Sequence, residues 1–490
     1  MQKRSSSHSD KLYRKPDAAD SGRSVLTDRR EDNESSRDDA TLVRLFCLWV
    51  FLQCFEYTAV PSLEWNLGIT VSPDRVVLFV LLLAYARRGN HSSRVSRPAT
   101  IAARMLELFM LLFAVIGTAS WFAAGVDAEG QKFYYLTRLF NLSFLPAAAY
   151  FIGRRLQYTR TMLKEIRLFL AALGVYLGVT SVSEHFGLNA LVFPKYILDP
   201  KLGIQFGRSR GPFLDTIGNG GMLLVSFLFL AYLSSSLQGL KRAVTFLLLL
   251  LMVLAIYFTD TRAIWLGLAA ITAILLTLRT TMRKTAAMIA CVTLCGFLSG
   301  AGSKFSAYQE TLFSRRQNTV DYRLENYQIT WRMFEKNPVF GIGFGRFREE
   351  WSNYFDKVDA RTRDLVDGNH TTLLGILAEL GIVGFAAYVA ILACLGIICV
   401  TAYRRLDEDS WAFERGFVVI ASGAFTSLFV LGLTNDLRST GIVSVCAFWL
   451  VGIASSMHCS YLASKSARSL RPTQRVPVLK RVGRGSVFST

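Results

Sequence analysis

The chain has 490 residues, of which 52% are hydrophobic and 19% charged, and its mean hydropathy is +0.33. Soluble domains carry about 25% charged residues, so this composition excludes a string of soluble domains, a wholly disordered chain, a collagen-like rod and a disulfide scaffold. The formal net charge of +19 is compatible with nucleic acid, an acidic membrane surface or a signal for membrane orientation. The position of the positive residues in the chain decides between these.

The first 40 residues are polar, and their nine basic and nine acidic residues cancel. We expect residues 1–40 to be a disordered cytoplasmic tail, because they lack the apolar residues that build a core. No apolar run lies near Met1, so we do not expect a cleaved signal peptide.

Twelve apolar segments follow, each about long enough to cross the ~30 Å hydrocarbon core as a helix. They predict an all-α, polytopic integral membrane protein with about 12 transmembrane helices. Ten or eleven spans remain possible, because Asp74 and Arg75 interrupt the second segment. The segments are 42–60, 68–86, 104–124, 135–153, 166–186, 217–236, 241–259, 262–279, 284–301, 375–402, 412–433 and 440–461.

The segments group into regions. We expect transmembrane helices 1–9 in residues 41–301, a small helical periplasmic cap in 302–374, helices 10–12 in 375–461 and a basic cytoplasmic tail in 462–490. The cap region is too long for a simple connection and contains an amphipathic pattern over residues 322–334.

Basic residues in the loops predict the orientation. With the N-terminus in the cytoplasm, the inner loops hold 18 basic residues, and the short outer connections hold only Lys132, Arg262 and Arg438. The inner face, with the C-terminal tail, then carries +20 and everything else −1. The net charge is therefore a signal of orientation, with both termini inside, and we expect no nucleic-acid partner.

Two groups of outer arginines can bind an anion. Arg208 and Arg210 stand beside Gly211 just before a predicted span, where guanidinium groups and a helix N-terminus suit phosphate oxygens. Arg262 ends a very short turn between two apolar runs. The alternatives are contact with lipid headgroups for all three, and for Arg262 also a structural contact with Asp260.

The cap and the segment after it add further polar candidates. Arg316 and Arg323 can bind substrate or form a solvated face, and the glycines of residues 341–345 predict a tight turn against the membrane domain. His370 stands just before a membrane-entering helix, where a neutral imidazole can take a proton from a hydroxyl. Asn369 is its neighbour, and Glu379 lies inside the helix as an inward polar contact that can orient a neighbour.

The arginines near positions 210 and 262 and the histidine at 370 are distant in sequence, yet all fall on the predicted outer surface. Anion-binding groups and a candidate base at one water–lipid boundary suit a lipid-linked phosphate substrate. No set of His, Asp and Glu with metal-ligand spacing occurs on that face, so we expect arginine to stabilise the charge and expect neither a metal nor a cofactor.

The pattern resembles the O-antigen ligase and O-antigen polymerase superfamily of bacterial envelope enzymes. The resemblance covers about residues 200–400, and its motifs are short but ordered. They are Arg210-Gly211-Pro212-Phe213, Thr261-Arg262-Ala263, Arg323-Leu324-Glu325 with Trp331, residues 337–343, and His370 followed by Leu373-Leu374, Glu379-Leu380-Gly381 and Gly384. Thr371, Ala263 and the stretch around Asp215 differ from the residues that many relatives have at these positions.

The resemblance implies a GT-C-like helical protein of the bacterial inner membrane with a periplasmic active site. It implies an inverting, metal-independent glycosyltransferase that takes a glycan from undecaprenyl diphosphate. The acceptor is a lipid A-core sugar for a ligase or another carrier-linked repeat for a polymerase. Arg210 and Arg262 would hold the diphosphate, and His370 would activate the acceptor hydroxyl. A transporter of lipid-linked glycans is the rival interpretation, but the two halves of the chain show no repeat.

Overall fold

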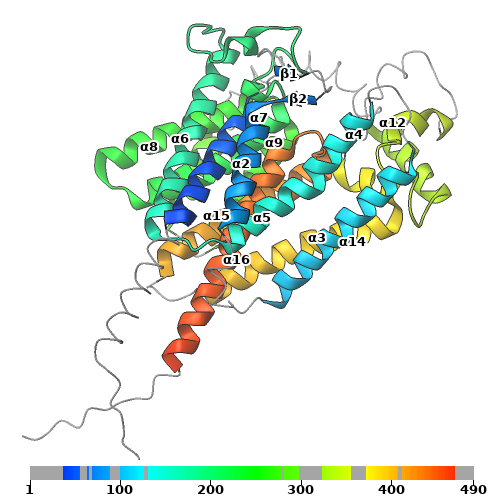
Figure 1. Cartoon of the computed structure of the whole chain (residues 1–490). Helices are drawn as coiled ribbons and strands as arrows, with labels where there is room; N and C mark the ends of the chain where they lie inside the picture. Colours follow the sequence, from blue (N-terminus) through cyan, green and yellow to red (C-terminus); the bar gives the residue numbers. More distant parts are fainter. Residues whose placement is uncertain are drawn as a thin grey trace, which may run out of the picture.

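The computed structural model describes residues 37–55, 63–65, 69–88, 100–125, 131–278, 281–296, 323–354, 371–406 and 411–469. These residues are almost entirely helical, and the helices pack side by side in a bundle (Figure 1). Their apolar side chains share one large buried core. The predicted all-α, polytopic membrane fold is thus confirmed.

The N-terminal half begins with a helix over residues 37–53. It continues with β1 (Leu63–Trp65), β2 (Ile69–Val71), α2 (Pro73–Arg87), α3 (Ile101–Ala123), α4 (Gln131–Leu139), the π-helix η3 (Phe140–Phe144), α5 (Leu145–Arg155), α6 (Arg160–His185) and the 3-10 helices η4 (Lys195–Leu198) and η5 (Gly211–Phe213). β1 and β2 pair antiparallel.

The C-terminal half contains the remaining helices. They are α7 (Thr216–Ser236), α8 (Gly239–Phe258), α9 (Arg262–Thr277), α10 (Arg283–Gly296), a helix over residues 323–336, α12 (Phe347–Glu350), η7 (Trp351–Tyr354), α14 (Thr372–Arg405), α15 (Ala412–Thr434) and α16 (Gly441–Ser469).

Seven helices in the described part of the chain are long and apolar enough to cross a membrane, namely α3, α6, α7, α8, α14, α15 and α16. The other predicted spans correspond to the shorter helix over residues 37–53, to α2, α9 and α10, and to the continuous run α4–η3–α5. Each predicted segment therefore contains a helix, while the number of spans remains a prediction.

Three predicted boundaries are corrected by the structure. The first helix begins at residue 37, so the last four residues of the expected tail are helical, and residues 1–36 lie outside the described part. The second helix begins at Pro73 instead of 68, since β2 precedes it and the fixed φ of proline suits a first helical position. α16 runs to Ser469 and not to 461, and residues 470–490 lie outside the described part.

The centre of the bundle is formed by α7 and α16. The share of buried residues in an apolar stretch of 18 residues differs between the helices. All of these residues are buried in α16 and 89% in α7, but only 28% in α3 and in α8. α16 packs on α5 and α15, and α7 packs on α6 and α8. A Cβ at Gly452 of α16 would lie 2.5 Å from the carbonyl oxygen of Tyr150, so this glycine permits close approach of α16 to α5.

The described part of the predicted cap packs on α14. The helix over residues 323–336 has one apolar face, since Ile329 and Met333 pack with α12 and η7 while Leu324 and Trp331 are exposed. This small cluster contains Ile329, Met333, Phe347, Trp351 and Ala378 of α14. The described cap residues are thus joined to the membrane domain by apolar contact. Residues 302–322 and 355–370 of the predicted cap lie outside the described part.

Candidate active site

Arg210 is buried inside the segment that joins α6 to α7. Its side chain is 0% exposed, and its Nη2 donates to the carbonyl oxygens of Ile197 at 2.9 Å and Asp199 at 2.6 Å. Nη1 donates to the carbonyl of Leu202. Three carbonyls from one loop therefore hold the guanidinium, and Arg210 in turn orders that loop.

Glu184, near the end of α6, supports the same arrangement. One carboxylate oxygen accepts from the backbone N–H groups of Arg210 at 3.1 Å and Gly211 at 3.0 Å, and the other lies 3.8 Å from the Arg210 Nε. Burial lowers the pKa of Arg210, and the nearby Glu184 and Asp199 oppose that shift. Sequence reasoning missed Glu184, although an acidic residue near the end of an apolar predicted span was an available signal.

These contacts favour a structural role for Arg210 over the predicted direct binding of an anion. A direct contact with a diphosphate would require the guanidinium to leave the three carbonyl acceptors of Nη1 and Nη2. The geometry favours a positioning role, and the direct contact remains a prediction.

The Arg262 turn lies beside the Arg208–Arg210 segment. α8 ends at Phe258 and α9 begins at Arg262, with Asp260 between them at a φ of +51°. The backbone N–H of Ser209 donates to the carbonyl of Phe258 at 3.0 Å, and Nε of Arg208 lies 4.0 Å from Oδ2 of Asp260. The structure therefore confirms the tight turn and joins two clusters that are distant in sequence.

Arg262 itself is exposed at the N-terminal end of α9. The first N–H groups of a helix point out of its N-terminus and favour a negative charge there. Thr261 donates its hydroxyl to Thr216 Oγ1 at 3.0 Å, which connects this end of α9 to the start of α7. The exposed guanidinium and the start of α9 together can bind an anion.

The start of α7 is also joined to the α15–α16 connection. The Asp215 carboxylate caps α7 by accepting from the N–H groups of Ile217 at 3.2 Å and Gly218 at 2.9 Å. The hydroxyl of Thr440 donates to Asp215 Oδ2 at 3.0 Å. Four parts of the chain therefore meet here: the loop before α7, the α8–α9 turn, the α15–α16 connection and, through the latter, the start of α14.

α14 is broken at Gly381, where φ is +62° and ψ is −164°. The backbone of residues 338–343 fills the break. The N–H groups of Ile342 and Gly343 donate to the carbonyls of Ala378 at 2.9 Å and Glu379 at 3.0 Å. Beyond the break, two N–H groups of α14 donate back to the carbonyls of residues 338 and 339. The predicted tight turn is confirmed, and it supplies the hydrogen bonds that the helix loses.

Alanine at Gly341 tests this insertion. Gly341 has a φ of +70°, and an added Cβ would lie 2.4 Å from the carbonyl carbon of Glu379. Gly187 is the matched control, because its φ is +65° but a Cβ there meets nothing within 4 Å. We expect Gly187→Ala to cost only backbone strain, about 1–3 kcal/mol, and Gly341→Ala to lower the thermal unfolding midpoint in detergent clearly further. Equal shifts would contradict a stabilising insertion.

A buried charge cluster holds the first part of α14. Arg438 and Glu379 are both 1% exposed, and Nη1 of Arg438 lies 2.7 Å from Oε2 of Glu379. Arg438 also donates Nε and Nη2 to the two oxygens of Asp436, each at 2.8 Å. The N–H of Gly345 donates to Glu379 at 3.0 Å, and Nη1 of Arg138 lies 4.0 Å from Asp436. The cluster connects four parts of the chain.

The charges in this cluster stabilise one another. Burial opposes ionisation of Asp436, but the charge and hydrogen bonds of Arg438 outweigh it and hold the pKa of this carboxyl below its usual value. Burial likewise opposes the charge of Arg438, and the two carboxylates together raise its pKa above the ordinary value. The predicted inward polar contact of Glu379 is confirmed. A substrate contact remains a prediction, and full burial against Arg438 favours positioning.

Sequence reasoning did not identify Asp436 and Arg438 as a pair with Glu379. Arg438 was read only as one of three outer basic residues. The available signal was an acidic and a basic residue two positions apart in a short connection between two apolar helices, where charges need partners.

Of the four remaining predicted site residues, only Arg323 lies in the described part of the chain. His370, Asn369 and Arg316 lie outside the described residues. Arg323 is exposed at the first residue of its helix. The chain directly after His370 is held firmly: Thr371 caps α14 by accepting from the N–H of Leu374 at 3.1 Å. The N–H and hydroxyl of Thr372 both donate to the carbonyl of Asn435, at 3.1 and 2.9 Å.

Comparison with known protein families finds a match for one part of the chain. Residues 247–389 match a family model described as O-Antigen ligase. The match includes Arg262, the insertion at residues 338–343 and Glu379. No curated protein matches the chain. Residues 247–389 are therefore similar to the O-antigen ligase family, which supports the resemblance to the ligase and polymerase superfamily of bacterial membrane proteins.

Proposed function

We propose that the protein is an inverting glycosyltransferase that moves a glycan from undecaprenyl diphosphate to an acceptor hydroxyl, such as a lipid A-core sugar. The reaction takes place at the periplasmic face of the inner membrane, with both termini in the cytoplasm. The observation that carries the proposal is the position of Arg262: exposed at the start of α9 and beside the Arg208 segment, within the residues that match the O-antigen ligase family.

Each residue has a role in this proposal. His370 takes the proton of the acceptor hydroxyl, whose oxygen attacks the anomeric carbon of the donor. The bond between that carbon and the diphosphate breaks, and undecaprenyl diphosphate leaves with the electron pair. Arg262 and the N-terminus of α9 stabilise the leaving charge, and no metal is required. Arg210 keeps the neighbouring loop in place. Arg208, Arg316, Arg323 and Asn369 contact the donor or acceptor.

The proposal is tested with purified protein in liposomes, a donor linked to undecaprenyl diphosphate and a lipid A-core acceptor. We expect transfer to continue in EDTA and to fall about 10²–10³-fold in Arg262→Ala, because a group that stabilises transition-state charge is lost. Lys241→Ala is the control, since this lysine is exposed at the other end of α8. Full activity of Arg262→Ala, or strict metal dependence, would overturn the assigned chemistry.

Deletion of the gene separates ligase from polymerase, which the family does not distinguish. Loss of all long chains on the lipid A-core indicates the ligase. A core that carries a single repeat indicates the polymerase instead.

A further inference from the structure

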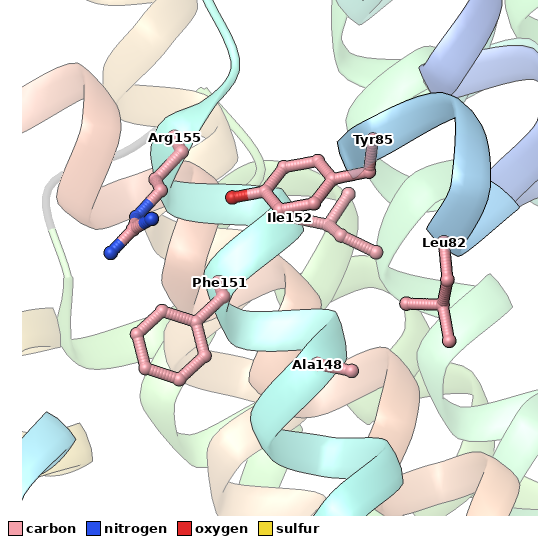
Figure 2. A pocket seen from close by; sticks show the side chains of 6 residues that line it. All are labelled: Leu82, Tyr85, Ala148, Phe151, Ile152 and Arg155. Atoms are coloured by element: carbon pink, nitrogen blue, oxygen red, sulfur yellow. The ribbon is translucent and has the colours of Figure 1, made fainter. Parts of the chain in front are cut away.

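A groove lies between α2 and α5, and none of the residues that line it belongs to the candidate active site. It has a volume of about 310 Å³ and is lined by Leu82 and Tyr85 of α2 and by Ala148, Phe151, Ile152 and Arg155 of α5 (Figure 2). The lining is almost entirely apolar, so the groove suits a hydrocarbon chain.

The groove lies beside a surface of α2 that is rich in exposed apolar side chains. Around it α2 exposes large apolar side chains, with Phe79 at 63%, Val80 at 44% and Leu83 at 41%. α2 corresponds to a predicted span, and on a helix in a membrane such a surface contacts acyl chains.

One end of the groove is positively charged. Arg155 is exposed at the end of α5, and its guanidinium lies 5.4 Å from the centre of the Phe151 ring, at the mouth of the groove. The Tyr85 hydroxyl points toward the same end (Figure 2). In the described part of the chain, no carboxylate forms an ion pair with Arg155. A phosphate at this end would therefore meet a cation without a competing acid.

Other charged residues near Arg155 add to the positive charge at this end of the groove. Arg87 is exposed at the end of α2. Arg88 is neutralised by the buried Asp39, with Nε and Oδ1 2.6 Å apart, and its Nη1 donates to the carbonyl of Arg155 at 3.2 Å. That hydrogen bond fixes the ends of α2 and α5 together. The loops at this end are rich in Lys and Arg, which places it on the cytoplasmic side.

We propose that this groove binds one anionic phospholipid of the cytoplasmic leaflet. An acyl chain lies between Leu82, Ala148 and Phe151, and the headgroup phosphate contacts Arg155 and the Tyr85 hydroxyl. Basic groups at the cytoplasmic surface favour anionic headgroups, and the apolar lining favours the chain. The site is independent of the glycan-transfer site on the opposite side of the membrane.

Native mass spectrometry of the delipidated, full-length protein with added phosphatidylglycerol or phosphatidylcholine tests the proposal. We expect the wild type to retain one phosphatidylglycerol in preference to phosphatidylcholine. Arg155→Gln should weaken the phosphatidylglycerol complex about fivefold, as expected for one arginine near an anionic headgroup. Ala148→Trp should fill the groove and abolish retention of both lipids. Lys241→Gln, which removes an exposed cation at another helix end, should change neither.

Several results would overturn the proposal. Equal retention of the two lipids by the wild type would exclude headgroup recognition. Equal losses in Arg155→Gln and Lys241→Gln would show general surface attraction. Displacement of phosphatidylglycerol by undecaprenyl phosphate would assign the groove to the carrier lipid. If Ala148→Trp does not fold, the exposed position of Arg155 keeps Arg155→Gln decisive.

Discussion

Replacement of Arg438 by methionine is expected to destabilise the protein by about 3–5 kcal/mol, as is usual when one partner of a buried ion pair is removed. The methionine would leave the Glu379 carboxylate, itself 1% exposed, without its charged partner. Asp436 would lose two hydrogen bonds of 2.8 Å at the same time. The thermal unfolding midpoint in detergent measures the effect.

A double variant separates the effect of the unpaired Glu379 charge from the effect of replacing the Arg438 side chain. Arg438→Met combined with Glu379→Gln removes both charges, so we expect it to be more stable than Arg438→Met alone. Arg44→Gln is the matched control. Its pair with Glu165 is also short, at 3.0 Å, but the two side chains are 67% and 38% exposed, so its loss should lower the unfolding midpoint far less. If the Arg438 and Arg44 variants unfold at the same temperature, the buried cluster does not hold α14.

The sequence predicted the helices and the tight turn well, because both leave local signals. Apolar runs of sufficient length identify helices whatever their partners, and a run of glycines identifies a turn. The break in α14 at Gly381 left no such signal, since glycine is common inside apolar membrane segments. The positive φ of this glycine accompanies the insertion of residues 338–343, which lie about 40 positions away and which the local sequence does not indicate.

The partners of charged residues were harder to predict. Arg438 lies 59 positions after Glu379, and nothing in either local sequence links them. Arg210 was predicted to bind an anion because it precedes a helix, yet its acceptors are backbone carbonyls, which no residue type marks. Arg262 differs because the short α8–α9 turn places it at a helix start whatever its partners. Its position could therefore be predicted, unlike the partners of the buried arginines.

Replacement of His370 by alanine is expected to lower glycan transfer about 10²–10⁴-fold, the usual contribution of a general base. The loss should appear in kcat with little change in KM for the donor, because the base acts on the acceptor hydroxyl in the transition state. His91→Ala is the matched control, since that histidine lies in a predicted cytoplasmic loop. The measurement is the rate of transfer in the liposome assay at saturating donor.

Added imidazole distinguishes a base from a structural residue. A small base can enter the space left by the alanine and restore part of the rate, which it cannot do if the histidine only supports the fold. The variant should stay folded, because the contacts that hold the start of α14 are made by Thr371 and Thr372 with Leu374 and Asn435. An unchanged unfolding midpoint with imidazole-dependent recovery would fit proton transfer at position 370. A His370→Ala protein as active as His91→Ala would remove this residue from the mechanism and leave Arg262 as the element that the proposed chemistry requires.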